Sequence, residues 1–193
     1  EHVDAAGVRA AFGMPRGIVL ALGLLCFISF LAEGSMLDWS AVFLRDFRGF
    51  SVASAGIGYA AFSVAMAVGR LGGDRIVARF GPVMTVRLGA CTAAAGFLLA
   101  SMLAWPPAAP IGFVLVGLGA ANIVPVMFGA AGRLPGSSPG IAIATVTALG
   151  YAGLLSGPAL IGFLAQASSL PMALAAVAGL LLLTAASARL VRS

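Results

Sequence analysis

The stretch GRLGGDRIVARFGP (69–82) lies between two long apolar runs and is unusually polar for this chain. It holds three arginines, one aspartate and four glycines, whereas only 9% of all 193 residues are charged. The apolar runs on either side, 52–71 and 83–103, each have about the 20 residues that a helix needs to cross roughly 30 Å of hydrocarbon. A short charged connector between two such runs indicates a loop at a membrane surface.

The composition of the chain agrees with this interpretation. Hydrophobic residues make up 61% of the sequence. A soluble domain has only about 45–50% apolar residues and about 25% charged ones. The chain is therefore predicted to be an integral membrane protein. Because it opens at Glu1 and not at a methionine, we expect it to be a piece of a longer protein.

Six apolar stretches are long enough to span a bilayer, and their continuous apolar character indicates helices and not barrel strands. Proline, glycine and serine interrupt the chain between the last four of them. We therefore predict an all-α membrane protein with six transmembrane helices. The first span begins at Gly17 and reaches Gly34 or beyond, and the others cover 52–71, 83–103, 111–131, 141–165 and 170–190.

The arginines are distributed unevenly between the two sides of the membrane that six spans define. The side with both termini holds Arg9, Arg16, Arg70, Arg75, Arg79, Arg87, Arg133, Arg189 and Arg192, and the other holds Arg45 and Arg48. Cytoplasmic loops carry the excess of positive residues. We therefore expect a multi-pass membrane protein with both ends of this segment in the cytoplasm.

Asp74 distinguishes the segment 69–82 from a simple orientation signal, because acidic residues contribute little to the orientation of a membrane protein. Beside Gly72 and Gly73, its carboxylate can face an arginine or the positive N-terminal end of a neighbouring helix. Such a contact can break and form again when helices move, so a gating role is one interpretation. A plain topology signal is the alternative for Arg75 and Arg79.

These residues resemble the cytoplasmic motif G-x-x-x-D-[RK]-x-G-[RK]-[RK] of the major facilitator superfamily, which follows helix two and is repeated more loosely after helix eight. Asp74, Arg75 and Arg79 match it. Arg70 stands in place of the first glycine, Val77 replaces the second, and Ala78 replaces a basic residue. Such departures are typical of the second copy, so the resemblance implies helices seven to twelve, the C-terminal half of a transporter.

Three further stretches support this resemblance. Gly153, Gly157 and Pro158 resemble the G-x-x-x-G-P motif of helix five, here in the equivalent helix eleven, although close helix packing alone also explains the glycines. AEGSMLDWSAVFLRD (32–46) and GLGAANIVPVMFGAAGR (117–133) are similar to bacterial facilitators related to the rhizopine-transport protein of rhizobia.

The resemblance implies one lobe of the major facilitator fold, built as a 3+3 inverted repeat. Residues 1–16 would be the cytoplasmic linker from the missing N-terminal half, and 17–193 the six-helix lobe. It also implies secondary transport of a small solute such as a sugar, polyol or amphiphile by alternating access. The expected partners are this solute, a proton, the lipid bilayer and the other half of the protein.

Glu33 is the main candidate for binding a substrate or a proton, because ionisable groups within a membrane span are costly and are usually functional. If the first helix continues to about Arg45, Glu33 lies near its middle. A carboxylate in an apolar cavity can take up a proton near neutral pH. A structural role, with another side chain as partner, is the alternative.

Four other polar residues are candidates for the same site. Asp38 can contact substrate or pair with Arg45 or Arg48, and Trp39 can stack on a sugar ring or anchor the helix at the interface. Asn122 can bind a hydroxylated ligand or join two helices. Tyr59 is a weaker candidate, and we expect it to share a polar face with Glu33 and Asn122.

Other function classes find little support in the sequence. It contains no hydrolase or metalloprotease motif, and His2 is its one histidine, so we expect no enzyme, metal site or cofactor. The net charge of +5 comes from arginines that indicate membrane orientation and not nucleic-acid binding. A non-transporting scaffold or receptor on the same fold stays open as an alternative.

Overall fold

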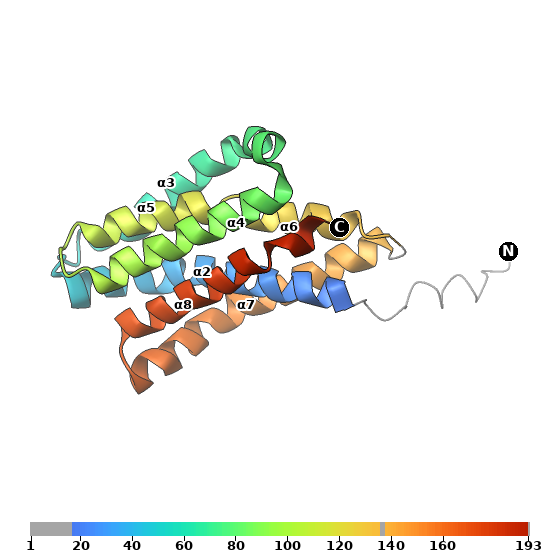
Figure 1. The fold of residues 1–193 in the computed structure, drawn as a ribbon. Coiled ribbons are helices and arrows are strands. Elements are labelled where there is room, and N and C mark those ends of the chain that lie inside the picture. The colour runs from blue at the N-terminus through green and yellow to red at the C-terminus, as the bar shows by residue number, and fades with distance from the viewer. Residues whose placement is uncertain (1–16, 136–137, 193) are drawn as a thin grey trace, which may run out of the picture.

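The computed structural model describes residues 17–135 and 138–192, which are mostly helical (Figure 1). The helices are α2 (Gly17–Arg48), α3 (Ile57–Leu71), α4 (Gly73–Met102), α5 (Ala108–Ala120), α6 (Ile123–Gly132), α7 (Pro139–Ala167), α8 (Leu170–Ala186) and the 3-10 helix η1 (Ala188–Arg192). The prediction of an all-α protein is confirmed over these residues. The predicted linker 1–16 lies outside them.

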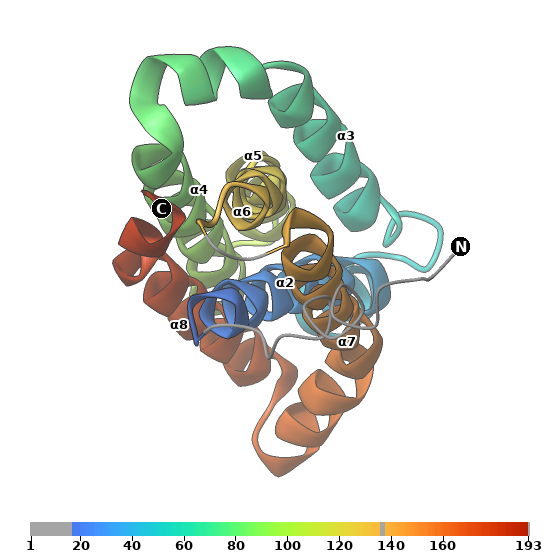
Figure 2. The same cartoon turned by 90° about the vertical axis from the view of Figure 1, so that its right-hand side faces the viewer.

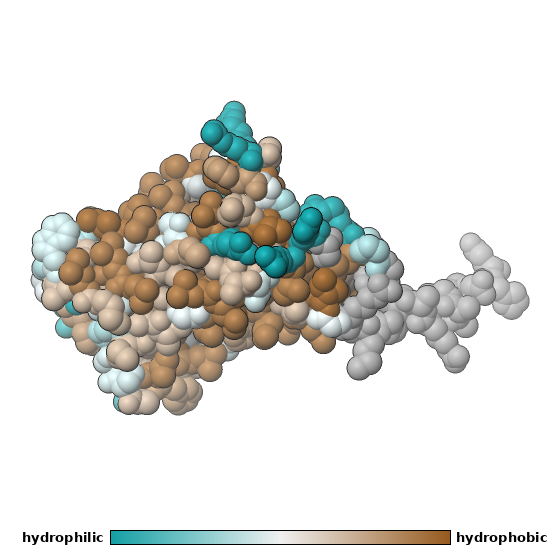
Figure 3. Space-filling model, viewed as in Figure 1, coloured by the Kyte–Doolittle hydropathy of each residue, from teal (hydrophilic) through white to brown (hydrophobic). Residues whose placement is uncertain are grey.

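Four helical stretches are long and apolar enough to cross a membrane, namely α2, α4, α7 and α5 with α6 taken together. The two other apolar helices, α3 and α8, are shorter, with 15 and 17 residues. Apolar residues cover most of the surface in Figure 3, and the strongly polar ones are few and localised. The structure is thus that of a multi-pass helical membrane protein, and six complete spans stay a prediction.

The first helix is longer than a simple span. The segment after Gly34 has no breaker, so α2 extends over 32 residues from Gly17 to Arg48. Gly49, directly after the helix, has a φ of +72°, a conformation that glycine adopts without steric cost. Glu33 therefore lies in the middle of α2, as the longer of the two sequence interpretations requires.

The charged segment 69–82 is helical and not a loop. Gly72 ends α3 and directly precedes α4, so the two helices meet at a corner. Gly81 has φ +75° and ψ 164°, and with Pro82 it bends α4 after a first short helical part. Thr85 Oγ1 donates to the Gly81 carbonyl at 2.8 Å. Figure 2 shows this corner standing away from the rest of the bundle.

The predicted fourth span is divided into α5 and α6. Asn122 lies between them with φ −112° and ψ 0°, outside the regular helical range. Pro125 follows one turn later and cannot donate a backbone hydrogen bond to Ala121. The apolar run is continuous in the sequence, so hydropathy alone gave no sign of this break.

The helices form two similar groups. In the end-on view of Figure 2, α5 with α6 lies between α3 and α4, and α2 lies between α7 and α8. Glycines allow the backbones to approach closely: a Cβ atom on Gly117 would overlap the Phe62 carbonyl of α3, and one on Gly153 would overlap the Phe27 carbonyl of α2. Small residues at such contacts are typical of helix packing in membranes.

Candidate functional site

Glu33 and Arg70 form an ion pair inside the helix bundle. Arg70 belongs to the last turn of α3, and its Nη2 lies 3.5 Å from Glu33 Oε2 in the middle of α2. The Glu33 side chain is only 13% exposed, whereas that of Arg70 is 50% exposed. Glu33 Oε1 is buried and has no hydrogen-bond partner among the described residues. A buried carboxylate with an unused acceptor is costly unless another group binds it.

A cavity of about 320 Å³ adjoins this pair. Its polar lining consists of Glu33, Arg70, Ser63 and Tyr59, and its apolar lining of Leu37, Phe62, Met66, Ala67 and Leu154. Ser63 Oγ is also buried and has no hydrogen-bond partner in the described part of the chain. The structure therefore brings Glu33 and Tyr59 together, and it adds two side chains that sequence reasoning did not place there.

The sequence places Arg70 in the motif around Asp74 and does not connect it with Glu33. One signal in the sequence pointed to a different role, because Arg70 replaces the glycine with which the motif begins. The structure shows that its side chain reaches from the corner of α3 and α4 toward α2. Ser63 gave no comparable signal, since a serine in an apolar helix usually bonds to its own backbone.

A second cavity, of about 550 Å³, lies beside the corner of α3 and α4. Arg70, Gly73, Asp74, Asn122 and Arg133 line it, together with apolar residues of α4 and α6. Arg70 thus borders both cavities. The predicted contact of Asp74 with an arginine is not formed within the described residues, where the ion pairs are Arg70–Glu33 and Arg45–Asp46.

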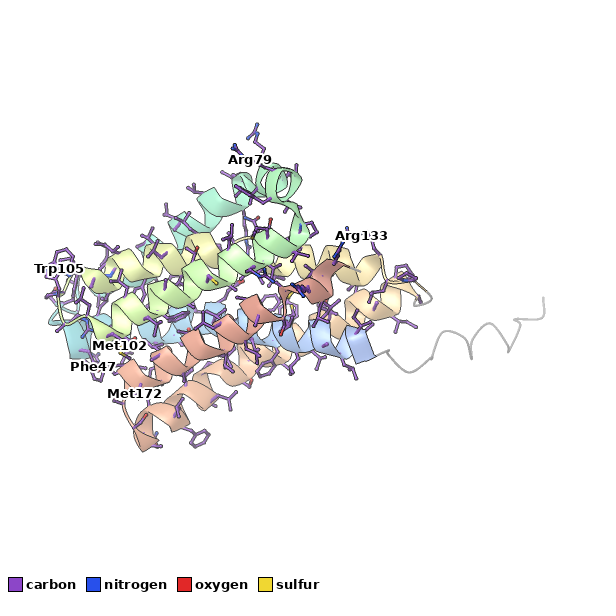
Figure 4. All side chains as sticks on the ribbon, in the orientation of Figure 1. Phe47, Arg79, Met102, Trp105, Arg133 and Met172 are labelled. Carbon is purple, nitrogen blue, oxygen red and sulfur yellow. The ribbon has the colours of Figure 1, made fainter. Side chains whose placement is uncertain are left out.

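The other motif arginines are exposed. Arg75 and Arg79 lie on the first part of α4, outside the lining of both cavities. Figure 4 shows Arg79 at the outer tip of the corner and Arg133 at the end of α6. The Arg79 guanidinium lies 5.7 Å from the centre of the Phe80 ring.

Asn122 lies away from the Glu33 cavity, contrary to the expected polar face. Its Nδ2 donates to the Gly69 carbonyl at 3.0 Å, and its side chain is buried. A Cβ atom on Gly73 would overlap Asn122 Oδ1. This contact corresponds to the alternative in which Asn122 joins two helices.

Asp38 does not make the expected salt bridge. It is exposed on α2, while Arg45 pairs with the adjacent Asp46. Arg48 Nη2 donates to the carbonyls of Ala100 and Ser101, at 2.6 and 3.2 Å. These last carbonyls of α4 have no intrahelical partner, so an arginine near them is favourable.

Trp39 packs against α7. The nearest atoms to a Cβ on Gly162 would be those of the Trp39 ring, at 3.3 Å. Gly153 likewise lies against α2, whereas Gly157 has ordinary van der Waals space toward Leu31. Trp39 and the glycines of the Gly153–Pro158 motif therefore belong to the contact between α2 and α7.

Comparison with known proteins identifies the family. No family model matches the chain. An uncharacterized MFS-type transporter of Yersinia pestis is 53% identical over 180 residues, which is 93% of this chain and 47% of that protein. The chain belongs to the major facilitator superfamily. It spans about half the length of the curated relatives that it matches.

Two rhizobial proteins are further relatives of this MFS-type chain. An uncharacterized transporter of Sinorhizobium fredii is 37% identical over 157 residues, covering 81% of this chain and 42% of the relative. Membrane protein MosC of Rhizobium meliloti is 32% identical over 167 residues, covering 86% of this chain and 41% of that protein. Both agree with the resemblance to rhizobial facilitators.

The fold has a counterpart among solved structures. A crystal structure of the peptide transporter POT (E310Q mutant) in complex with sulfate superposes with a TM-score of 0.79, covering 97% of this chain and 42% of that one. The two sequences are 16% identical, so the likeness concerns the fold of the MFS-type chain.

Proposed function

We propose that this chain is the C-terminal half, helices seven to twelve, of a secondary transporter that moves a small solute by alternating access with proton coupling. The proposal rests on the Glu33–Arg70 ion pair, which adjoins a cavity near the middle of helix α2. In the superfamily, substrate and ion sites lie near the bilayer midplane. An ionisable pair at that depth is a functional site by default.

The arrangement of helices supports a 3+3 inverted repeat. The first three helices would be α2, α3 and α4, and the second three α5 with α6, α7 and α8. If the two sets of helices are exchanged, the contact of α2 with α7 corresponds to the contact of α5 with α3. Both contacts are extensive. The same exchange maps the contact between α4 and α8 onto itself.

The chemistry of the cavity suits a small hydroxylated solute, such as a sugar or a polyol. Glu33 offers an acceptor, Arg70 offers several donors, and the hydroxyls of Ser63 and Tyr59 can act as either. The apolar residues of α2, α3 and α7 would contact the carbon skeleton. The missing N-terminal half would supply the other wall of the site.

Glu33 would couple transport to protons through its pairing with Arg70. When the carboxylate is ionised, it attracts the guanidinium; when it is protonated, the attraction falls and Arg70 is free to bind the solute. Asp74, Arg75, Arg79 and Gly73 would act at the cytoplasmic gate, where the corner of α3 and α4 meets the second cavity. Asp38 and Trp39 would affect the site indirectly, from the outer part of α2.

The orientation follows from the arginines. Arg133 and Trp105 lie toward opposite ends of the bundle in Figure 4, and the end with Arg133 would face the cytoplasm. Both ends of the segment 1–193 would then be cytoplasmic, in the bacterial inner membrane. The rhizobial relatives suggest a place in the rhizopine-transport-like subfamily.

The test uses the full-length transporter, because the proposed site is completed by the other half. The protein is reconstituted in liposomes with an imposed pH gradient, and the uptake of a panel of radiolabelled sugars and polyols is measured. We expect at least one solute to accumulate, and a protonophore to abolish the accumulation. Binding of a solute without any translocation would instead support a receptor or scaffold.

A further inference from the structure

Asn122 holds the end of α3 from the break between α5 and α6. Its backbone is outside the regular helical range, and its side chain contacts the corner of α3 and α4. Nδ2 donates to the Gly69 carbonyl at 3.0 Å, and the residue is 9% exposed. Because Gly69 lies in the last turn of α3, this bond ties that turn to α5 and α6.

The oxygen of the Asn122 amide lies against the first turn of α4, at Gly73. Oδ1 would overlap a Cβ atom on residue 73, so the amide fits in this position because residue 73 is a glycine. A Cβ atom on Gly69 would in turn lie only 2.7 Å from the methyl group of Ala121. The Asn122 side chain is therefore confined between the last turn of α3 and the first turn of α4.

Arg70 directly follows the residue that Asn122 binds. Its side chain is long, half exposed and joined to Glu33 by one contact of 3.5 Å. Such a side chain loses rotamer entropy when it is fixed. A small displacement of its backbone can therefore end the contact with Glu33.

We infer that Asn122 is a positioning residue, whose amide holds the last turn of α3 so that Arg70 reaches Glu33. The inference rests on the proposed function, in which Glu33 takes up a proton. It also connects the break between α5 and α6 with the ion pair: when α6 moves relative to α5, the amide moves Gly69 and withdraws Arg70 from Glu33.

An ordinary helix-joining hydrogen bond makes a different prediction. It would contribute to stability, and its loss would leave the titration of Glu33 unchanged. Ser101 provides the matched control, because its buried hydroxyl donates to the Phe97 carbonyl within α4 at 2.8 Å. Loss of that bond affects only α4, at a position distant in sequence from Glu33 and Arg70.

The experiment follows the protonation of Glu33 directly, without a transported solute. Infrared spectra of the full-length transporter in lipid are recorded across a pH series, and the Glu33 carboxyl band is identified by its absence in Glu33→Gln. We expect Asn122→Ala and Gly73→Ala to shift the titration midpoint in the same direction as Arg70→Gln. We also expect no additional shift when Asn122→Ala is combined with Arg70→Gln.

The outcomes separate the inference from the proposed function. If Arg70→Gln shifts the midpoint but Asn122→Ala and Gly73→Ala lower only the melting temperature, as Ser101→Ala would, the positioning role is wrong and the proton site stands. If Arg70→Gln itself leaves the midpoint unchanged, both the positioning role and the coupling through Arg70 are wrong. Should Asn122→Ala fail to fold, Gly73→Ala decides, because one methyl group displaces the amide.

Discussion

Arg70 Nη2 lies 3.5 Å from Glu33 Oε2, so the ion pair joins the last turn of α3 to the middle of α2. The pair is asymmetric: the carboxylate is nearly buried and has one oxygen without a hydrogen-bond partner in the described part of the chain, whereas the guanidinium is half exposed. Arg70 also borders the cavity that contains Asp74. One arginine therefore connects the proposed proton site with the corner of α3 and α4.

We expect Glu33→Gln to abolish accumulation driven by a pH gradient and to spare counterflow exchange. The amide keeps the size and the polarity of the side chain but cannot bind and release a proton. Uptake and exchange by the full-length protein in liposomes measure the two activities. Asp46→Asn is the control, because this exposed acid lies at the end of the same helix. Retention of both activities in Glu33→Gln would remove Glu33 from the site.

Asp74→Asn is expected to lower the transport rate of the full-length protein. Asp74 lines the cavity beside the corner of α3 and α4, and the proposal assigns it to the gate. If its charge contributes a coupling free energy of about 1–3 kcal/mol, the rate falls by about 5–150-fold. Initial rates of uptake test this, with Asp46→Asn again as the control. Wild-type rates for every solute would contradict a gating role.

Gly153→Ala is expected to destabilise the protein by about 1–3 kcal/mol, the usual cost of overpacking. The added methyl group would overlap the Phe27 carbonyl, and α7 would have to move away from α2. Gly179→Ala is the matched control on α8, because nothing lies within 4 Å of its Cβ position. Thermal unfolding of both variants in detergent measures the difference. Equal melting temperatures would contradict the expected cost of moving α7 away from α2.

We expect Arg48→Met to lower stability by about 1.5–3 kcal/mol, the contribution of a hydrogen bond from a charged group. The change removes the bonds to the Ala100 and Ser101 carbonyls and keeps an apolar side chain near Phe43, whose ring centre is 4.7 Å from the guanidinium. Arg45→Met, which removes only the exposed pair with Asp46, is the control and is expected to change the melting temperature little. An equal effect of both changes would exclude the proposed capping of α4.

Several features of the fold could be predicted from the sequence because they depend on local composition. Long apolar runs in a chain that is 61% hydrophobic indicate membrane helices wherever they lie in space. The absence of a breaker after Gly34 allowed a helix long enough to place Glu33 at its middle. The motif around Asp74 resembled the superfamily, and the relatives confirm that resemblance.

The candidate site was predicted less completely. Glu33 and Tyr59 share a cavity as expected, but Arg70 and Ser63 complete its polar lining, and Asn122 is bonded elsewhere. An apolar run does not reveal where it breaks, so the division of the fourth span at Asn122 had no signal in hydropathy. A charged side chain in a motif also does not reveal which neighbouring helix it faces.

Sequence alone thus determined that the chain is a helical membrane protein of the major facilitator superfamily, because hydropathy, charge distribution and motif spacing are properties of single segments. Only the tertiary structure decided the partners of the polar side chains. Arg70 meets Glu33, and Asn122 meets Gly69, because the packing of the helices and the corner at Gly72 bring together residues that are far apart in the chain. Such contacts depend on the relative position and rotation of whole helices, which no single segment specifies.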